Sequence, residues 1–326
     1  MSMRRIKYYQ AINEALAQLL ERDERVFLIG QGLDSPWSVG RTIEGLSARF
    51  GNKRVIDTPL AEGGFTGIGI GAALVGMRPV IVHPRMDFMF LAMDQIFNNA
   101  AKWHYMFGGE VNVPVVIRAI VNRGGGQAAQ HSQSLQAMFC HVPGIKVVMP
   151  STAYDAKGLL IAAVEDGNPV VFIDDKWLYD SESEVPEEAY GVPIGKGVIR
   201  RIGKDVTVAA VSYMAEQALE AALCLERDGI DVEVIDLRSI KPLDEKLLLE
   251  SVKKTGRLVT ADGGWQSCGV GSEISAIVAE KAFAYLKAPI LRVSLPEAPA
   301  PASCVLEDAY YPRAKEIVSA VKRLLG

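Results

Sequence analysis

The stretch Asp57-Thr-Pro-Leu-Ala-Glu62-Gly-Gly-Phe-Thr-Gly-Ile-Gly-Ile-Gly-Ala-Ala73 organises the rest of this chain. The apolar run Arg54-Val-Ile56 before it predicts a strand, and Pro59 marks a turn after that strand. The turn delivers one carboxylate, Glu62, to the start of a helix rich in glycine and alanine. An acid in the first turn of a helix also complements the helix dipole, so Glu62 has an ordinary structural explanation beside a functional one.

Length and composition indicate a two-domain globular protein. The chain has 326 residues, of which 49% are hydrophobic and 23% are charged. This length exceeds what one small core organises well, so two domains are expected. Lys and Arg total 35 against 39 Asp and Glu, for a net charge of −4. That weak acidity favours neither nucleic acid nor a membrane surface as a partner.

Cysteine usage and the N-terminus favour a cytoplasmic protein. The four cysteines are widely spaced and form no CxxC pair, so neither a zinc site nor a disulfide framework is predicted. The first residues lead into an amphipathic helix without the apolar core of a signal peptide. No apolar run in the sequence reaches membrane-spanning length.

The first half of the chain alternates between strand and helix patterns, which predicts a parallel sheet. Apolar spacing indicates a helix from about Lys7 to Arg22, followed by a buried strand at Val26–Ile29. That strand ends in the loop Gly30–Asp34, where open α/β sheets place ligand contacts. Further strands are expected at Pro79–Val82, Val113–Ile120, Lys146–Met149 and Pro169–Ile173, with helices at about Met89–Trp103 and Tyr154–Glu165.

A second alternating block follows a segment rich in Glu, Pro and Gly, residues 186–200, which reads as a linker. The glycine-rich run from Asp262 is expected to open a helix that approaches the sheet closely, since its spacing does not fit a dinucleotide-binding turn. The other elements expected in this block are strands at Val206–Val211, Val232–Ile235 and Arg257–Thr260 and helices at Ala215–Asp228 and Leu243–Lys254.

Several motifs match one family in order and spacing: Asp57–Glu62, Met93–Ile96, Asn99–Lys102, Gln130–Ser134, Cys140–Val148, Asp155–Leu160, Asn168–Val171, Asp236–Asp244 and Pro296–Pro301. Across nearly its whole length, the chain resembles the β subunit of the thiamine-diphosphate-dependent first component of 2-oxo acid dehydrogenases, of the pyruvate and branched-chain type, in the transketolase superfamily. The resemblance implies a two-domain α/β fold. A parallel-sheet pyrimidine-binding domain would occupy residues 1–185 and a transketolase C-terminal-like domain residues 201–326.

The resemblance also implies a role for each matching residue near the cofactor. Glu62 would bind N1′ of the aminopyrimidine of thiamine diphosphate and act in catalysis, with the cofactor performing the carbanion chemistry. We expect Glu62 to be buried among Leu60, Phe65 and Ile68, with Leu60 also contacting the cofactor. Phe88 matches an aromatic residue that lies against the pyrimidine ring.

His131 is the second expected catalytic residue. It matches a histidine that handles the substrate, or the lipoyl group during acyl transfer. A histidine that exchanges protons near neutral pH suits both tasks. The alternative is an ordinary histidine in a surface loop.

Two positions depart from the family pattern. Gln31-Gly32 stands where relatives commonly carry an acidic pair, which removes a proton-relay group from the expected cofactor site. Val82-His83-Pro84-Arg85 replaces an acid followed by apolar residues. We hypothesise that His83 or Arg85 faces the substrate and changes which 2-oxo acid or acyl acceptor is used, since arginine can bind a carboxylate through two hydrogen bonds. The alternative is that both side chains point to a surface or subunit contact.

The resemblance further implies ions and partners. The Gly-Asp-Gly motif that holds Mg²⁺ and the diphosphate in the superfamily is missing, so a separate α subunit is expected to carry the Mg²⁺ site in an α2β2 heterotetramer with a β2 contact. A lipoyl acyltransferase core is the further expected partner. A loop for a monovalent cation such as K⁺, built mainly from backbone carbonyls, is matched by Val115, Ala163, Val164, Asp166 and Asn168, although Asp-Gly-Asn is also an ordinary turn.

Three functions remain open. The first is oxidative decarboxylation of a 2-oxo acid with acyl transfer to lipoamide. The second keeps the cofactor but cleaves acetoin or transfers groups as transketolase does. The third is a non-catalytic assembly subunit in which Glu62 only starts a helix.

Overall fold

The computed structural model describes residues 3–37 and 39–326, which divide into two compact units. The first unit runs to Arg123 and resumes at Met138–Ile194, and the second comprises Gly124–Ala137 and Gly195–Gly326. The boundary after Ile194 falls inside the expected linker 186–200. The assignment of Gly124–Ala137 to the second unit was not expected, because this segment lies within the first domain by sequence.

The main sheet of the first unit is parallel, with the strand order β6-β7-β5-β4-β2-β3. Its strands are almost wholly apolar because helices cover both faces of the sheet. This confirms the predicted parallel arrangement. The strands are β2 (Val26–Gln31), β3 (Val55–Thr58), β4 (Arg78–His83), β5 (Val116–Val121), β6 (Lys146–Val148) and β7 (Val170–Asp175).

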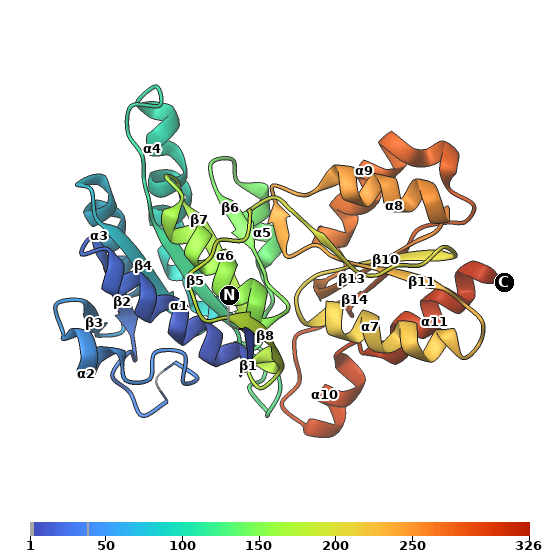
Figure 1. Cartoon of the computed structure of the whole chain (residues 1–326), viewed down its shortest axis with the longest axis horizontal. Coiled ribbons are helices and arrows are strands. Elements are labelled where there is room, and N and C mark those ends of the chain that lie inside the picture. The colour runs from blue at the N-terminus through green and yellow to red at the C-terminus, as the bar shows by residue number, and fades with distance from the viewer. Residues whose placement is uncertain (1–2, 38) are drawn as a thin grey trace. The chain divides into compact units, whose positions relative to one another are not determined.

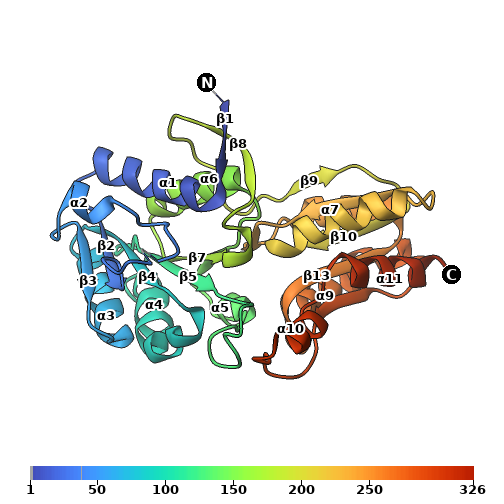
Figure 2. The ribbon, with the colours of Figure 1, turned by 90° about the horizontal axis from the view of Figure 1, so that it is seen from below.

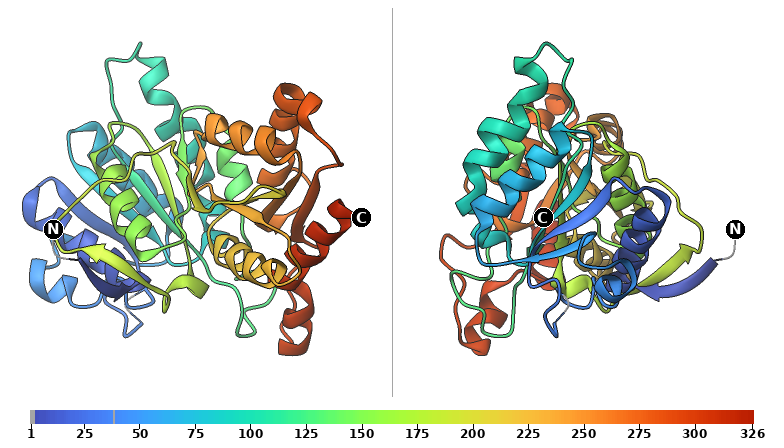
Figure 3. Two further views of the ribbon diagram at one scale, coloured as in Figure 1. Left: turned by 45° about the vertical axis from the view of Figure 1, so that its right-hand side comes forward. Right: turned by 90° about the vertical axis from the view of Figure 1, so that its left-hand side faces the viewer.

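Helices form a layer on each side of this sheet, as Figures 2 and 3 show. The helices α1 (Tyr8–Arg22) and α6 (Ala153–Glu165) pack together on one side, and α3 (Glu62–Leu74) and α4 (Ala101–Met106) lie on the other. Of the helices in the described residues, none combines the length and the apolarity needed to cross a membrane. Short helices are α2 (Leu46–Phe50), α5 (Gln136–His141) and η3 (Lys176–Leu178).

One local expectation for the first unit was wrong, and one pair of strands was not expected. The segment expected as one long helix at Met89–Trp103 is divided into the 3₁₀ helix η1 (Met86–Ala92), the π-helix η2 (Asp94–Ala100) and α4. In η2, the Asn99 side chain donates to the Asp94 carbonyl at 3.2 Å, five residues back, which matches the wider turn. At the N-terminus, β1 (Met3–Lys7) pairs antiparallel with β8 (Glu182–Pro186) before α1 begins.

The second unit holds a sheet with the order β14-β13-β10-β11-β9, parallel except for the edge strand β9. In Figure 1, α7 and α11 lie on one side of this sheet, and α8 and α9 on the other. The strands are β9 (Val198–Arg201), β10 (Val206–Ala210), β11 (Val232–Asp236), β13 (Leu258–Trp265) and β14 (Leu291–Leu295), with the short β12 (Ser239–Lys241) outside this order. The helices are α7 (Tyr213–Glu226), α8 (Glu245–Thr255), α9 (Val270–Ala282), η4 (Phe283–Tyr285), α10 (Cys304–Tyr310) and α11 (Ala314–Leu325).

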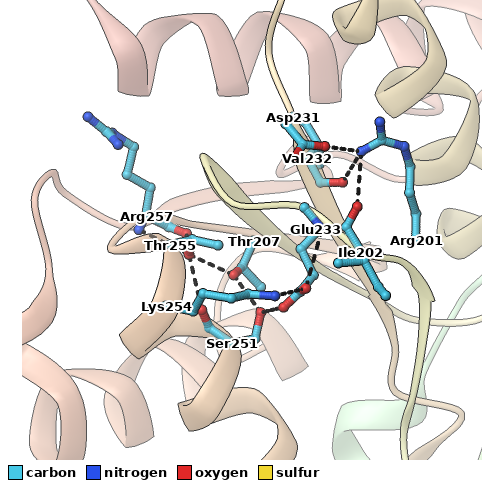
Figure 4. A network of polar contacts seen from close by, with 11 residues as sticks. Arg201, Ile202, Thr207, Asp231, Val232, Glu233, Ser251, Lys254, Thr255 and Arg257 are labelled. Carbon is cyan, nitrogen blue, oxygen red and sulfur yellow. Dashed lines mark hydrogen bonds and ion pairs between the residues drawn. The ribbon is translucent and has the colours of Figure 1, made fainter.

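A buried acid on β11 fastens helix α8 to this sheet (Figure 4). The fully buried Glu233 accepts hydrogen bonds from Ser251 Oγ at 2.5 Å and from Lys254 Nζ. The Ser251 hydroxyl also bonds to that of Thr207 on β10, at 2.7 Å. The Gly203 amide also donates to this carboxylate, at 3.4 Å. The buried carboxylate is therefore hydrogen-bonded as buried charges require, by two side chains of α8 and one backbone amide outside that helix.

Candidate functional site

The strand order of the first unit has a switch point at the carboxyl ends of β2 and β4. From β2, the chain continues to β3 on one side, whereas β4 and the later strands extend the sheet on the other side. Open parallel sheets bind ligands outside the strand ends at such a switch point. Gln31 ends β2 and His83 ends β4, so two of the candidate residues lie at this point.

Glu62 is the first residue of α3 and is only 7% exposed. Ala61 precedes it as the N-cap and contributes no side-chain hydrogen bond. Among residues 3–37 and 39–326, no group forms a hydrogen bond or ion pair with the Glu62 carboxylate. Its two oxygens are not among the enclosed side-chain atoms that lack a partner in the described residues, so they stay accessible from outside the chain. Glu62 is therefore placed to pair with a group supplied from outside this chain.

The expected surroundings of Glu62 were wrong in part. Phe65 is buried as predicted, but Leu60 and Ile68 are 74% and 62% exposed. Leu60 lies in the turn before α3, and Ile68 falls on the outward face of that helix. Helical spacing explains the difference, because Phe65 and Ile68 lie three residues apart near the margin of the buried stripe.

His83 is buried at the end of β4 and is held against α3. Its Nε2 lies 3.1 Å from the Thr66 hydroxyl, and its ring centroid lies 5.0 Å from that of Phe65. Burial lowers the pKa of His83 to about 3, so the imidazole is neutral at physiological pH. Within the described part of the chain, Nδ1 is enclosed and has no hydrogen-bond partner. Arg85 follows two residues later and is half-buried.

Two further residues shape the loops around the switch point. The Asp57 carboxylate accepts a hydrogen bond from the Leu33 amide at 3.0 Å, which holds the loop that follows Gln31. The sequence pointed to Asp57 only as part of a motif, although an acid at a strand end is a common loop anchor. Phe88 lies in η1, which packs on α3, and its side chain is half-buried.

His131 lies in Gly124–Ala137, the segment that belongs to the second unit. Its amide donates to the Ala128 carbonyl at 3.4 Å, and the residue is half-buried. The other candidate catalytic and cofactor-binding residues belong to the first unit. Sequence reasoning also missed Glu307 and Asp262, two buried acids of the second unit that bind this segment.

The expected cation loop lies around the turn between α6 and β7. The Val164 and Asp166 carbonyls accept hydrogen bonds from the Arg78 guanidinium, at 2.5 and 3.3 Å. The Asp166 carboxylate accepts from Lys146 Nζ at 2.5 Å. The Asn168 side-chain oxygen is buried and lacks a partner among the described residues. The chain thus offers one vacant oxygen acceptor there, beside oxygens that its own cations engage.

Two family models match the chain: the transketolase pyrimidine-binding domain over residues 4–181 and the transketolase C-terminal domain over residues 195–317. The chain therefore belongs to the transketolase family and carries both of these domains in order. The two matches agree with the parallel sheet and switch point of the first unit and with the separate α/β sheet of the second.

Within this family, the chain is similar over nearly its whole length to β subunits of oxidoreductases. It is 46% identical to the acetoin:2,6-dichlorophenolindophenol oxidoreductase subunit beta of Cupriavidus necator, over 99% of this chain and 98% of that protein. It is 44% identical to the mitochondrial pyruvate dehydrogenase E1 component subunit beta of Bos taurus, over 97% and 90%. A solved structure titled "Split gene transketolase, inactive beta4 tetramer" matches with a TM-score of 0.81 and 25% identity, over 98% of both chains. These findings confirm the predicted relationship to β subunits of this type.

Proposed function

We propose that this chain is the β subunit of a thiamine-diphosphate-dependent oxidoreductase that decarboxylates a 2-oxo acid, pyruvate or a branched-chain acid, and transfers the acyl group to lipoamide. The observation that carries the proposal is Glu62, a buried acid without a partner in the described residues, beside the switch point of the pyrimidine-domain sheet. The similarity to pyruvate dehydrogenase E1 β subunits supports it.

The residues of this chain fit the pyrimidine half of the cofactor. When bound, thiamine diphosphate supplies the carbanion chemistry that cleaves a bond next to a carbonyl group. Glu62 would bind N1′ and hold a proton there, which satisfies its buried carboxyl group. Phe88 would lie against the pyrimidine ring, and Gln31 and Leu60 would complete the contacts of this chain with the cofactor.

Side chains beyond the pyrimidine contacts would select and process the substrate. A neutral His83 can donate or accept one hydrogen bond through Nδ1 without charging the pocket. The Arg85 guanidinium would bind the carboxylate of a 2-oxo acid. His131 would exchange a proton with the substrate or with the lipoyl group during acyl transfer.

Acetoin cleavage is the second candidate reaction, and one observation favours it. Two relatives named as acetoin:2,6-dichlorophenolindophenol oxidoreductase subunit beta are 46% and 44% identical to this chain over 99% and 98% of its length. Acetoin carries no carboxylate, so the two reactions make opposite demands on Arg85.

The proposed assembly follows because this chain would bind only the pyrimidine half of the cofactor. An α subunit would bring the diphosphate and Mg²⁺ site, giving an α2β2 heterotetramer in the cytoplasm in which two β chains touch. A lipoyl acyltransferase would accept the product. The oxygens of Val115, Ala163, Val164, Asp166 and Asn168 would hold K⁺, and the vacant Asn168 oxygen supports this.

Reconstitution tests the proposed function. The chain is co-purified with a candidate α subunit, loaded with thiamine diphosphate and Mg²⁺, and assayed with 2-oxo acids and acetoin, using dichlorophenolindophenol as the electron acceptor. We expect cofactor-dependent dye reduction with pyruvate or a branched-chain 2-oxo acid. Turnover of acetoin alone would assign the second reaction, and a complex without activity on any substrate would contradict both.

A further inference from the structure

Two acids of the second unit form hydrogen bonds near the two ends of Gly124–Ala137, the segment that carries His131. We infer that Glu307 and Asp262 are positioning residues for His131, acting through the backbone and side chains of Gly124–Ala137. The inference rests on the role proposed for His131 and names the groups of this chain that give that residue a defined position.

The first anchor holds the start of the segment. The Gly126 amide donates to both carboxylate oxygens of Glu307, at 3.1 and 3.2 Å. Glu307 is only 6% exposed in the first turn of α10, and its own amide donates to the Ser303 carbonyl at 2.8 Å. Hydrogen bonds to a charged acceptor are stronger than those between neutral groups. A buried carboxylate therefore fixes a stretch of backbone that has left-handed φ angles at Gly124, Gly125 and Gly126.

The second anchor holds the end of the segment. Gln136 is fully buried and donates through Nε2 to Asp262 Oδ1 at 2.5 Å, and Asp262 is 2% exposed on β13. The Ser134 hydroxyl donates to Gln136 Oε1 at 2.7 Å, and the Gly264 amide donates to Asp262 at 3.3 Å. Gly264 also allows close approach, because a side-chain carbon there would lie 2.9 Å from Gln136 Nε2.

His131 lies between these anchors, five residues after Gly126 and five before Gln136. A loop with three successive glycines pays a large entropic cost to adopt one conformation, so its order depends on fixed contacts. Catalytic groups lose about 100-fold in rate when they are displaced by about 1 Å. Release of either anchor should therefore reduce a reaction that needs His131, through a change in the position of that residue.

The test uses the reconstituted complex with its α subunit, cofactor and a lipoyl acceptor. We expect Glu307→Ala to lower acyl transfer by about 10- to 100-fold. Glu307→Gln keeps one oxygen for the Gly126 amide and should restore most of the rate. Asp308→Ala is the matched control, because Asp308 is the exposed neighbour on the same helix. Equal losses in Glu307→Gln and Glu307→Ala, or a loss in the control, would overturn the inference.

A double-mutant cycle separates positioning from a general structural effect. If Glu307 acts through His131, Glu307→Ala adds no further loss to a His131→Asn variant. Independent, multiplying losses contradict the inference. Loss of activity in His131→Asn together with full activity in Glu307→Ala overturns the inference alone. Full activity in His131→Asn overturns the proposed role of His131 and the positioning role with it.

Residue-resolved hydrogen exchange of the wild-type complex tests the first anchor without a substitution, so it applies even if Glu307→Ala does not assemble. The Gly126 amide should exchange more slowly than the Gly125 amide, because its acceptor is a buried carboxylate. Equal exchange rates at the two glycines would contradict the hydrogen bond between Gly126 and Glu307 and would say nothing against the proposed reaction.

Discussion

The Thr66 hydroxyl and His83 Nε2 lie 3.1 Å apart, which joins the first turns of α3 to the end of β4. This contact places a buried imidazole next to the helix that begins with Glu62. The contact thereby connects the switch point of the sheet with the helix that carries Glu62, the acid that has no partner among residues 3–37 and 39–326.

His83 predicts a specific pH dependence of stability. Burial lowers the pKa of His83 to about 3 from the ordinary histidine value of 6.5, so the unfolded chain binds the extra proton first as pH falls. The contribution of His83 is complete above pH 6.5 and is lost as pH falls towards 3, by at most about 1.4 kcal/mol per pH unit. We expect urea unfolding of wild type and His83→Phe to show a constant difference above pH 7 that shrinks or reverses below pH 6.

The control for this experiment is His104→Phe, since His104 is exposed. His104 Nδ1 lies 3.0 Å from the Val111 carbonyl, so His104→Phe can lower the unfolding free energy, but its difference from wild type should not show the change between pH 7 and pH 5 that is expected for His83→Phe. A difference between wild type and His83→Phe that is the same at pH 5 and pH 7.5 would contradict a buried, neutral His83.

Arg85 should decide between the two candidate reactions. If its guanidinium binds the substrate carboxylate, Arg85→Met lowers kcat/KM for 2-oxo acids by about 10- to 100-fold, the value of a charge-assisted hydrogen bond. Turnover of acetoin, which has no carboxylate, should change little. Steady-state kinetics on both substrate types measure this, with Arg25→Met as a control at an exposed ion pair. An unchanged ranking of substrates would remove Arg85 from the specificity determinants.

The buried Arg118–Asp174 pair should dominate the stability of the first unit. Arg118 Nε and Nη2 donate to the two Asp174 oxygens at 2.9 and 2.8 Å, and both side chains are fully buried. Removal of one partner strands a charge in the core, so Arg118→Ala should cost about 3–5 kcal/mol in chemical unfolding. The exposed pair Arg22–Glu165 is the matched control, where Arg22→Ala should cost at most about 1 kcal/mol. Similar costs at the two sites would contradict this account.

The proposed cation loop predicts an effect of K⁺ on thermal unfolding. A cation that binds only the folded chain raises the unfolding midpoint, so the complex should melt at a higher temperature in KCl than in tetramethylammonium chloride. Asn168→Ala should reduce that difference, and the exposed Asn52→Ala should preserve it. Identical midpoints in the two salts would contradict a K⁺ site at these oxygens.

Sequence patterns predicted the elements that bury one continuous stripe of apolar residues. The strands at Val26, Val80 and Val206 and the helix ending at Arg22 lie where periodicity placed them, because burial on both faces leaves an unmistakable apolar run. The segment after Met86 was missed, since 3₁₀ and π turns keep nearly the same apolar spacing as an α-helix. β1 and β8 were missed because a two-stranded ribbon depends on pairing across most of the first unit.

The candidate site was only partly predictable for a related reason. Glu62 and His131 were found through motifs, and their burial or half-burial agrees with a functional role. The anchors Glu307 and Asp262 depend on contacts between residues more than 100 positions apart, which no local pattern encodes. The burial of His83 also depends on tertiary structure, because helix α3 and strand β4 must pack together to bring Phe65 and Thr66 against its ring.

The most direct measurement replaces Glu62 with glutamine in the reconstituted complex. Because no group among the described residues pairs with this carboxylate, Glu62→Gln should not lower the unfolding free energy of the cofactor-free chain. Turnover of the reconstituted complex should fall by about 100-fold or more, the usual loss when a proton-transfer group is removed. Normal turnover by Glu62→Gln, in a complex that still requires thiamine diphosphate, would contradict the account.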